Sequence, residues 1–323
     1  MCSLSEKRSV LAVLPAAILL ACGTPERSPR EAAAPPPVDT SLARRAAMLG
    51  PSRVAAIPAG PVRATWQSEH VLRVCADPNN LPFSNRAGKG FENRIAALIA
   101  RDIGARVVYT WWPQRRGFAR MTLNSGACDV IMGVPVGYDF AATTAPYYAS
   151  TYVFLTRHSR NLRISSLDDP VLRRLRIGLH TIGDDYANTP AAQALARRGI
   201  VRQVVGYSIY GDYSRPDPPA ELVRAVERGD VDVAIVWGPL AGYFASRSPE
   251  PLDIRPVTPR VEPPATRFVF AIAAGARRSD SATLGMLDRE ITRRAPEIRR
   301  ILNEYDVPLV EPERAVTGRG GGS

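Results

Sequence analysis

Two separate stretches of the chain alternate short apolar segments with helical patterns, and few folds accommodate such an arrangement. The first stretch has expected strands at 71–76, 106–111 and 129–133 and expected helices at 91–103 and 117–124. The second has expected strands at 176–179, 201–207 and 231–236 and expected helices at 190–198, after Thr189, and 219–228. This alternation is typical of sheets whose strands run mainly parallel. We therefore predict an α/β protein with two lobes.

The connections between the stretches suggest how the lobes are joined. Segments 151–155 and 267–273 have the pattern of strands that leave the first lobe and return to it, and a final helix over 283–305 would pack on that lobe. The expected domains are 69–156 with 266–312 for lobe 1 and 157–265 for lobe 2. Ligands of such sheets lie in a crevice at the carboxyl ends of the strands, and two crossing strands would let the lobes hinge around it. One large sheet is the alternative.

The N-terminus predicts export. Residues 1–22 have a charged start, an apolar run too short to span a bilayer, and a small-residue cleavage site, as a secretion signal does. Leu19–Cys22 also matches a bacterial lipobox, and no retention aspartate follows it. We expect a periplasmic protein anchored to the outer membrane through lipidated Cys22; ordinary cleavage beside an incidental cysteine is the alternative. Residues 23–68 and 313–323 are expected to be a disordered tether and tail.

Cysteine usage and charge bound the function further. Cys75 and Cys128 are the only cysteines beyond position 22, so they either pair in the oxidising compartment or serve as small buried apolar residues. The net charge of +11 favours acidic partners, but no nucleic-acid-binding motif is present and nucleic acid is set aside. The histidines are isolated and no paired metal-ligand motif occurs, so we expect neither a metal site nor an enzyme.

Five motifs carry a resemblance to a known family. The sequence LRVCADPNNLPFSN at 72–85 resembles the opening of family 3 extracellular solute-binding proteins. The quinoprotein-dehydrogenase-associated branch of that family, which includes the J-type accessory proteins of methanol dehydrogenase gene clusters, is similar to four further motifs: WWPQRRGF at 111–118, CDVIMGVP at 128–135, TTAPYY at 143–148 and WGPLAGYF at 237–244. The resemblance covers 71–310 and implies a type II periplasmic-binding-protein-like fold.

Two departures from the amino-acid-binding relatives are informative. Those relatives place an arginine after the third strand for the ligand carboxylate and an aspartate before a proline in lobe 2 for the ligand ammonium. Here residues 133–139 contain no arginine, and Trp237 occupies the second position. A zwitterion buried without charged partners would carry a penalty of several kcal/mol. We therefore do not expect an ordinary amino acid as the ligand.

The candidate ligand- or partner-binding residues follow the expected strand ends: Asp77, Asn79, Asn80, Phe83, Trp111, Trp112, Arg115, Arg116, Gly133, Pro135, Tyr138, Asp184, Asp185 and Trp237. An arginine at 115 or 116 could hold a carboxylate, and Trp237 could offer a stacking surface. Each residue also has a structural interpretation. Asp77 fits a turn, the aromatic side chains fit core packing, the arginines fit a solvated loop, and Asp184 and Asp185 fit a helix cap.

The resemblance and these residues together predict a non-catalytic accessory protein of a PQQ-dependent alcohol dehydrogenase, for methanol or a related alcohol. It would support assembly, activation or cofactor loading. No cofactor is expected to be bound permanently, but pyrroloquinoline quinone, which is flat and carries several carboxylates, is a possible transient ligand for tryptophan and arginine. The alternative is the substrate-binding component of an ABC importer for a small solute other than an amino acid.

Overall fold

The computed structural model describes residues 64–181, 189–208 and 213–311, and strands from both predicted stretches join in one hydrogen-bonded path. In order along the sheet the strands are β4 (Arg106–Trp111), β1 (Val71–Ala76), β5 (Val130–Pro135), β14 (Val269–Ala276), β7 (Tyr148–Arg157), β10 (Val233–Trp237), β8 (Ile177–Thr181) and β9 (Val204–Ser208). Short strands beside this path are β6 (Ala142–Thr143) on β14, β11 (Leu252–Pro256) on β7, and the pairs β2 (Asn79–Asn80) with β3 (Ser84–Asn85) and β12 (Val261–Glu262) with β13 (Thr266–Arg267).

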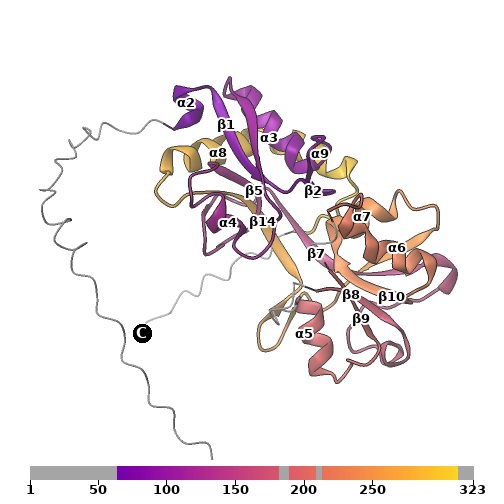
Figure 1. Ribbon diagram of the computed structural model, residues 1–323. Coiled ribbons are helices and arrows are strands. Elements are labelled where there is room, and N and C mark those ends of the chain that lie inside the picture. The colour runs from indigo at the N-terminus through magenta and orange to yellow at the C-terminus, as the bar shows by residue number, and fades with distance from the viewer. Residues whose placement is uncertain (1–63, 182–188, 209–212, 312–323) are drawn as a thin grey trace, which may run out of the picture. The chain divides into compact units, whose positions relative to one another are not determined.

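Strand direction divides the sheet into two parallel groups. β1 runs parallel to β4 and β5, and β8 runs parallel to β9 and β10. Between the groups, β14 and β7 are antiparallel to each other and to the strands beside them. Figure 1 shows β7 and β14 passing between two sets of helices. The path is continuous, but each group of strands has its own hydrophobic clusters, so the predicted two-lobed α/β fold is confirmed.

Lobe 1 is covered by helices from both ends of the described chain. The helix α3 (Phe91–Asp102) buries Phe91, Ile95 and Ile99, which recur every four residues on one face. Residues of α8 (Ser281–Arg293) and α9 (Ala295–Glu304) belong to the same cluster. The short helix α2 (Thr65–Ser68) also joins this lobe, because Trp66 packs against the cluster. Described structure therefore begins ahead of the predicted boundary at residue 69.

Two helices differ from prediction. The single helix expected over 283–305 is broken at Arg294, where α8 ends and α9 begins. Pro296 lies in the first turn of α9, where a missing N–H costs no hydrogen bond, whereas in the interior of one long helix it would remove one. The helix expected over 117–124 is only α4 (Phe118–Met121), and Gly117 before it has a φ of 84°.

Lobe 2 carries the remaining helices on its parallel strands. They are α5 (Pro190–Arg197), α6 (Glu221–Arg228), α7 (Gly238–Ala245) and the 3-10 turns η1 (His158–Arg160), η2 (Pro170–Arg174) and η3 (Pro218–Ala220). The Thr189 hydroxyl accepts a hydrogen bond from the Ala192 N–H at 3.4 Å, which confirms the predicted start of α5. None of the helices in the described residues is long and apolar enough to cross a bilayer.

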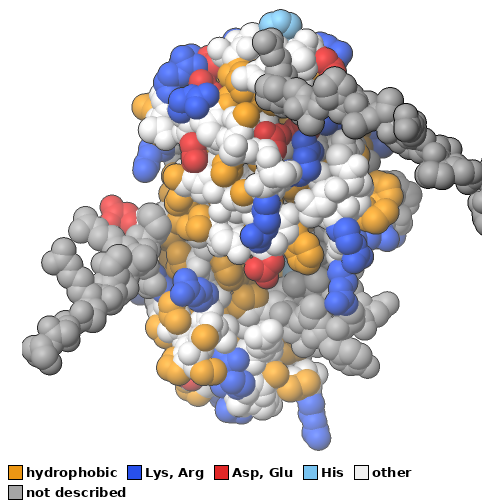
Figure 2. Space-filling view, turned by 90° about the vertical axis from the view of Figure 1, so that its left-hand side faces the viewer, with side chains coloured by type: hydrophobic (Ala, Val, Ile, Leu, Met, Phe, Trp, Pro, Cys, Tyr) orange, Lys and Arg blue, Asp and Glu red, His pale blue; other side chains and the backbone are white. Residues whose placement is uncertain are grey.

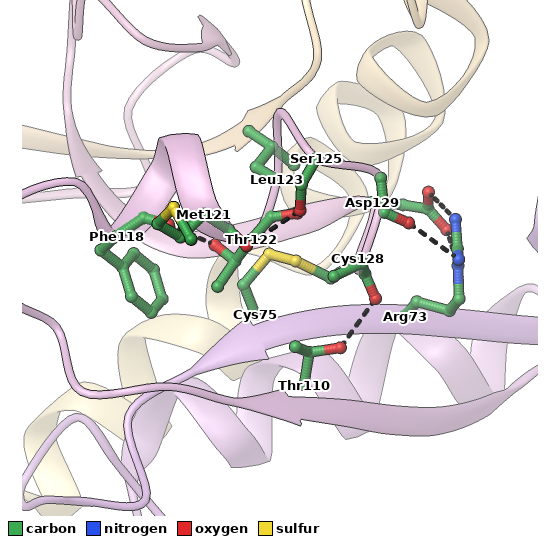
Figure 3. Close-up of a disulfide and its surroundings, with 12 residues drawn as sticks. Arg73, Cys75, Thr110, Phe118, Met121, Thr122, Leu123, Ser125, Cys128 and Asp129 are labelled. Atoms are coloured by element: carbon green, nitrogen blue, oxygen red, sulfur yellow. Dashed lines mark hydrogen bonds and ion pairs between the residues drawn. A yellow bond between two sulfur atoms is a disulfide. The ribbon is translucent and has the colours of Figure 1, made fainter.

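A disulfide links two neighbouring strands of lobe 1. Cys75 in β1 and Cys128 just before β5 are bonded, with their Cα atoms 5.5 Å apart, which settles the alternative that the sequence left open (Figure 3). Both cysteines are buried. The next residue, Asp129, accepts hydrogen bonds from Arg73 and Arg277, each at 2.6 Å. Burial disfavours the charge of Asp129, but these partners together hold the pKa of its carboxyl below the usual value.

Candidate functional site

A cavity of about 340 Å³ lies where the two parallel groups of strands meet. Its size falls within the range typical of small-molecule sites. Both crossing strands and both lobes contribute to its lining, which consists of Asp77, Asn79, Asn80, Phe83, Glu92, Gln114, Gly133, Pro135, Tyr148, Tyr152, Tyr213, Pro218, Trp237, Leu240, Phe270 and Ile272. The carboxyl ends of β1 and β5 in lobe 1 and of β10 in lobe 2 lie at this cavity, as expected for parallel sheets.

Asp77 organises one edge of the cavity. Its carboxylate accepts hydrogen bonds from the backbone N–H of Asn79 at 2.8 Å, the backbone N–H of Gln114 at 2.6 Å and the Tyr213 hydroxyl at 2.7 Å. The first donor belongs to β2 and the second to the loop after β4, both in lobe 1, whereas Tyr213 belongs to lobe 2. Asp77 is 3% exposed, so these three bonds compensate the loss of water around its charge.

The neighbouring loop adds further bonds between the lobes. The Asn79 side-chain amide donates to the carbonyl of Arg215 at 2.8 Å, and its oxygen accepts from the N–H of Asp217 at 3.3 Å. Asn80 donates instead to Gln114 within lobe 1, at 3.0 Å. The turn 77–80 therefore serves both purposes that the sequence suggested: it is a hydrogen-bonded turn, and it faces the cavity and lobe 2.

Trp237 lies at the end of β10 and lines the cavity. Its ring centroid is 5.6 Å from that of Tyr152 in β7 and 5.8 Å from that of Phe270 in β14. The Trp237 and Phe270 rings pack edge to face at 75°, and the Trp237 and Tyr152 rings are tilted by 56°. An aromatic wall thus occupies the position at which amino-acid-binding relatives place an aspartate.

Glu92 is a site residue that the sequence reasoning missed. It is the second residue of α3, and its carboxyl lies against the backbone of Gly133, where a Cβ would come within 2.0 Å of Glu92 Oε1. Burial, followed by the nearby charge of Asp77, raises the pKa of Glu92 to about 8. An acidic residue in the first turn of a helix is usually assigned to capping, and no pattern in the sequence pairs Glu92 with the distant Gly133.

Other predicted residues divide between the cavity and its surroundings. Phe83, Gly133 and Pro135 line it, and the Phe83 ring packs against Phe91 of the core at 5.4 Å. Trp111, Trp112, Arg115, Arg116 and Tyr138 lie outside the lining. The Trp111 ring stacks on Tyr109 at 4.5 Å, Trp112 is 43% exposed, and the Arg115 guanidinium lies 5.6 Å from the centre of the Tyr213 ring. Tyr138 packs against the hydrophobic cluster that contains Cys75 and Cys128. Asp184, Asp185 and Cys22 lie outside the described residues.

The charge of the cavity differs from the charge of the whole chain. Arginine and lysine side chains are scattered over the face in Figure 2 and are not gathered in one stripe. The lining has no arginine or lysine among the described residues, and it contains the carboxyl groups of Asp77 and Glu92. The described lining therefore offers no cationic side chain to the carboxylate of an amino acid. The described residues also contain no group of three or more potential metal ligands.

Comparison with known proteins identifies relatives along most of the described chain. Residues 133–284 match the family model for bacterial extracellular solute-binding proteins. The chain is 30% identical to protein MoxJ of Methylorubrum extorquens over 252 residues, which cover 74% of this chain and 81% of that protein. It is 28% identical to protein MoxJ of Paracoccus denitrificans, covering 74% of this chain and 89% of that protein.

A solved structure shows the same relationship. The periplasmic binding protein XoxJ of Methylobacterium extorquens AM1 is 33% identical to this chain, with a TM-score of 0.62 over 75% of this chain and 100% of XoxJ. Similarity in sequence and similarity in fold each extend over about three quarters of the chain. The chain therefore belongs to the MoxJ family of periplasmic solute-binding proteins, the branch that its motifs resemble.

Proposed function

We propose that this protein is a non-catalytic accessory protein of a periplasmic quinoprotein alcohol dehydrogenase, and that it binds this enzyme during assembly or activation. The observation that carries the proposal is its 30% identity to MoxJ over 81% of that protein, together with the motifs typical of the dehydrogenase-associated branch. The cavity lining agrees with it, because the charged anchors of an amino-acid importer are replaced by Trp237 and by a stretch after β5 that lacks arginine.

Loading of pyrroloquinoline quinone is the part of the expected role that the cavity does not support. A flat ligand with several carboxylates needs cationic or N–H partners when it is taken out of water. Arg115 and Arg116, the arginines expected to provide them, are not part of the lining, and Glu92 and Asp77 are. The described lining offers this cofactor two carboxyl groups and no cation and so fits it poorly, and we restrict the proposal to binding of the dehydrogenase.

The loop after β5 is a suitable contact surface for the enzyme. Pro135 lines the cavity. Two apolar side chains follow it in this loop, Val136, which is 49% exposed, and Phe140, which is 53% exposed. We name Val136 and Phe140 the apolar rim. Large exposed apolar side chains are typical of protein-binding surfaces, and aromatic residues contribute most to such interfaces.

Binding to the purified dehydrogenase tests the proposal. The mature chain is expected to bind the apo- or holo-enzyme in biolayer interferometry, and replacing both rim residues by Ser should raise Kd at least about tenfold, a loss of about 1.4 kcal/mol. The matched control is Val201→Ser, because Val201 is 59% exposed in lobe 2. Absence of binding by the unmodified chain, together with normal dehydrogenase activity in a deletion strain, would contradict the proposal.

We also propose that lipidated Cys22 anchors the protein to the outer membrane. The Leu-Leu-Ala-Cys sequence at 19–22 supports this. A lipoprotein carries more than one acyl chain on its cysteine, which is enough for stable anchoring. Cys22→Ala removes the residue that carries these chains, so in membrane fractionation the protein should move from the outer-membrane fraction to the soluble periplasmic fraction. Unchanged fractionation would exclude the anchor while leaving the binding proposal intact.

A further inference from the structure

The cavity lining combines aromatic side chains with carboxyl groups. The aromatic side chains are Phe83, Tyr148, Tyr152, Tyr213, Trp237 and Phe270, which come from both lobes and both crossing strands. The faces of such rings carry partial negative charge and attract cations, most strongly where water is excluded. They also offer apolar surface to alkyl groups. Such a lining suits a ligand that is both cationic and partly apolar.

Glu92 is the acidic group that lacks a compensating partner. Asp77 already accepts three hydrogen bonds, from Asn79, Gln114 and Tyr213. Glu92 has no hydrogen bond or ion pair of its side chain among the described residues, and the charge that acts on it is the like charge of Asp77. A half-buried carboxylate in this situation is stabilised most by a cation that enters the cavity.

We infer that the cavity binds a small organic ammonium ion, with its positive charge beside Glu92 and its alkyl groups against the aromatic wall. Gly133 contributes by leaving room for the Glu92 carboxyl, because a Cβ at this position would overlap it. Anions and zwitterions are disfavoured, since the described lining offers no arginine or lysine for a carboxylate. This inference concerns the ligand of the cavity and does not depend on the proposed partnership with a dehydrogenase.

Matched ligands that differ only in charge provide the test. We expect calorimetry on the full mature chain to show choline binding at least about tenfold tighter than its neutral isostere 3,3-dimethyl-1-butanol, which equals about 1.4 kcal/mol. Benzylammonium should likewise bind more tightly than benzyl alcohol, and the anion 3,3-dimethylbutanoate should not bind. Glu92→Gln should remove the preference for the cations over their neutral isosteres. Glu69→Gln is the control, because Glu69 is exposed and lies outside the lining.

Proton release provides an independent readout. Because burial raises the pKa of Glu92 to about 8, its carboxyl is largely protonated at neutral pH and must lose its proton when a cation binds. The affinity for choline should therefore rise between about pH 6 and about pH 9, and the heat of binding should depend on the ionisation enthalpy of the buffer. The other titratable groups around Glu92 are Asp77, Tyr109, Tyr147 and Tyr148, and the pKa values of the three tyrosines are raised.

The inference is overturned if neither cation binds, or if Glu92→Gln retains the preference for cations over neutral isosteres. It is also overturned if no small cation binds but Glu92→Gln weakens binding of the dehydrogenase, because the group at Glu92 would then be a lysine or arginine side chain of the partner. Failure of dehydrogenase binding with a normal choline response would instead contradict only the proposed function.

Discussion

Individual residues of lobe 1 determine both its stability and the properties of the cavity. The disulfide spans 53 residues of sequence, and a cross-link of this kind restricts the unfolded chain. Replacing Cys75 and Cys128 together by Ala should lower the free energy of unfolding by about 2–4 kcal/mol. Urea denaturation measures this change, and adding a reductant to the unmodified chain should give a similar loss. An unchanged midpoint in both experiments would show that the bridge does not contribute to stability.

Glu92 gives a pH dependence of the opposite sign to that of a salt-bridged acid. Its folded-state pKa of about 8 lies above that of an unfolded glutamate, so the folded state holds a proton that the unfolded state releases. Stability from this group is fully present below the unfolded value and is lost as the pH rises toward about 8. The free energy of unfolding of Glu92→Gln, relative to that of the unmodified chain, should increase by at most about 1.4 kcal/mol per pH unit across this window.

Thermal denaturation across this pH range checks the prediction, with Glu69→Gln as the surface control. A constant difference in stability between Glu92→Gln and the unmodified chain would contradict it.

Glu92 also shows the limit of what the sequence alone can predict. Asp77 was found because it follows an apolar strand, but the environment of Glu92 depends on Gly133, which is distant in sequence and contributes only empty space.

Among the described glycines, Gly242 in α7 leaves the least room for a side chain. A Cβ on Gly242 would lie 1.8 Å from the carbonyl oxygen of Asp306, in the segment that follows α9. Gly242→Ala should therefore destabilise the protein by about 1–3 kcal/mol, as overpacking does. The matched control is Gly285→Ala in α8, where the nearest atom is the end of the Arg289 side chain at 3.6 Å. This control should gain about 0.5–1 kcal/mol, because alanine favours the helix.

Urea denaturation of both variants decides the point, and equal effects at the two positions would show that α7 can shift away from Asp306 at no cost.

Most of the helices and strands could be predicted from the sequence. Strands 71–76 and 106–111 were predicted with the bounds that β1 and β4 have, because alternation and apolar runs report burial directly. The break between α8 and α9 was not predicted, since a proline is compatible with either the first turn of a new helix or a kink.

For the whole molecule, the contacts between lobes beside the cavity are the part that sequence could not supply. Residues 77–80 lie more than a hundred positions before Tyr213, Arg215 and Asp217, and no periodicity reports a contact over such a distance. The fold could be predicted because each lobe repeats a local pattern. The charge of the cavity could not, because Arg115 and Arg116, which were expected there from their position after strand 106–111, lie outside its lining.

The hydrogen bond from Tyr213 to Asp77 should couple the lobes without determining the fold. Tyr213→Phe removes this donor and is expected to cost about 1.5–3 kcal/mol, the range for a bond to a charged group. Hydrogen exchange should become faster at residues 77–80 and 213–217, whereas the strands of each lobe should keep their protection. Equal acceleration throughout lobe 2 would show that the residue maintains the fold instead.

The position of β14 has a consequence for the order in which the chain acquires its structure. This strand lies between β5 and β7 but follows them by more than a hundred residues. As the chain emerges from its N-terminus, Cys75 and Cys128 are both present long before the strand that completes their sheet. Oxidation can therefore join β1 to β5 while lobe 1 is still unfinished, whereas lobe 2 is synthesised as one uninterrupted segment. Newly exported molecules should accordingly acquire their covalent cross-link before their last long-range strand pairing.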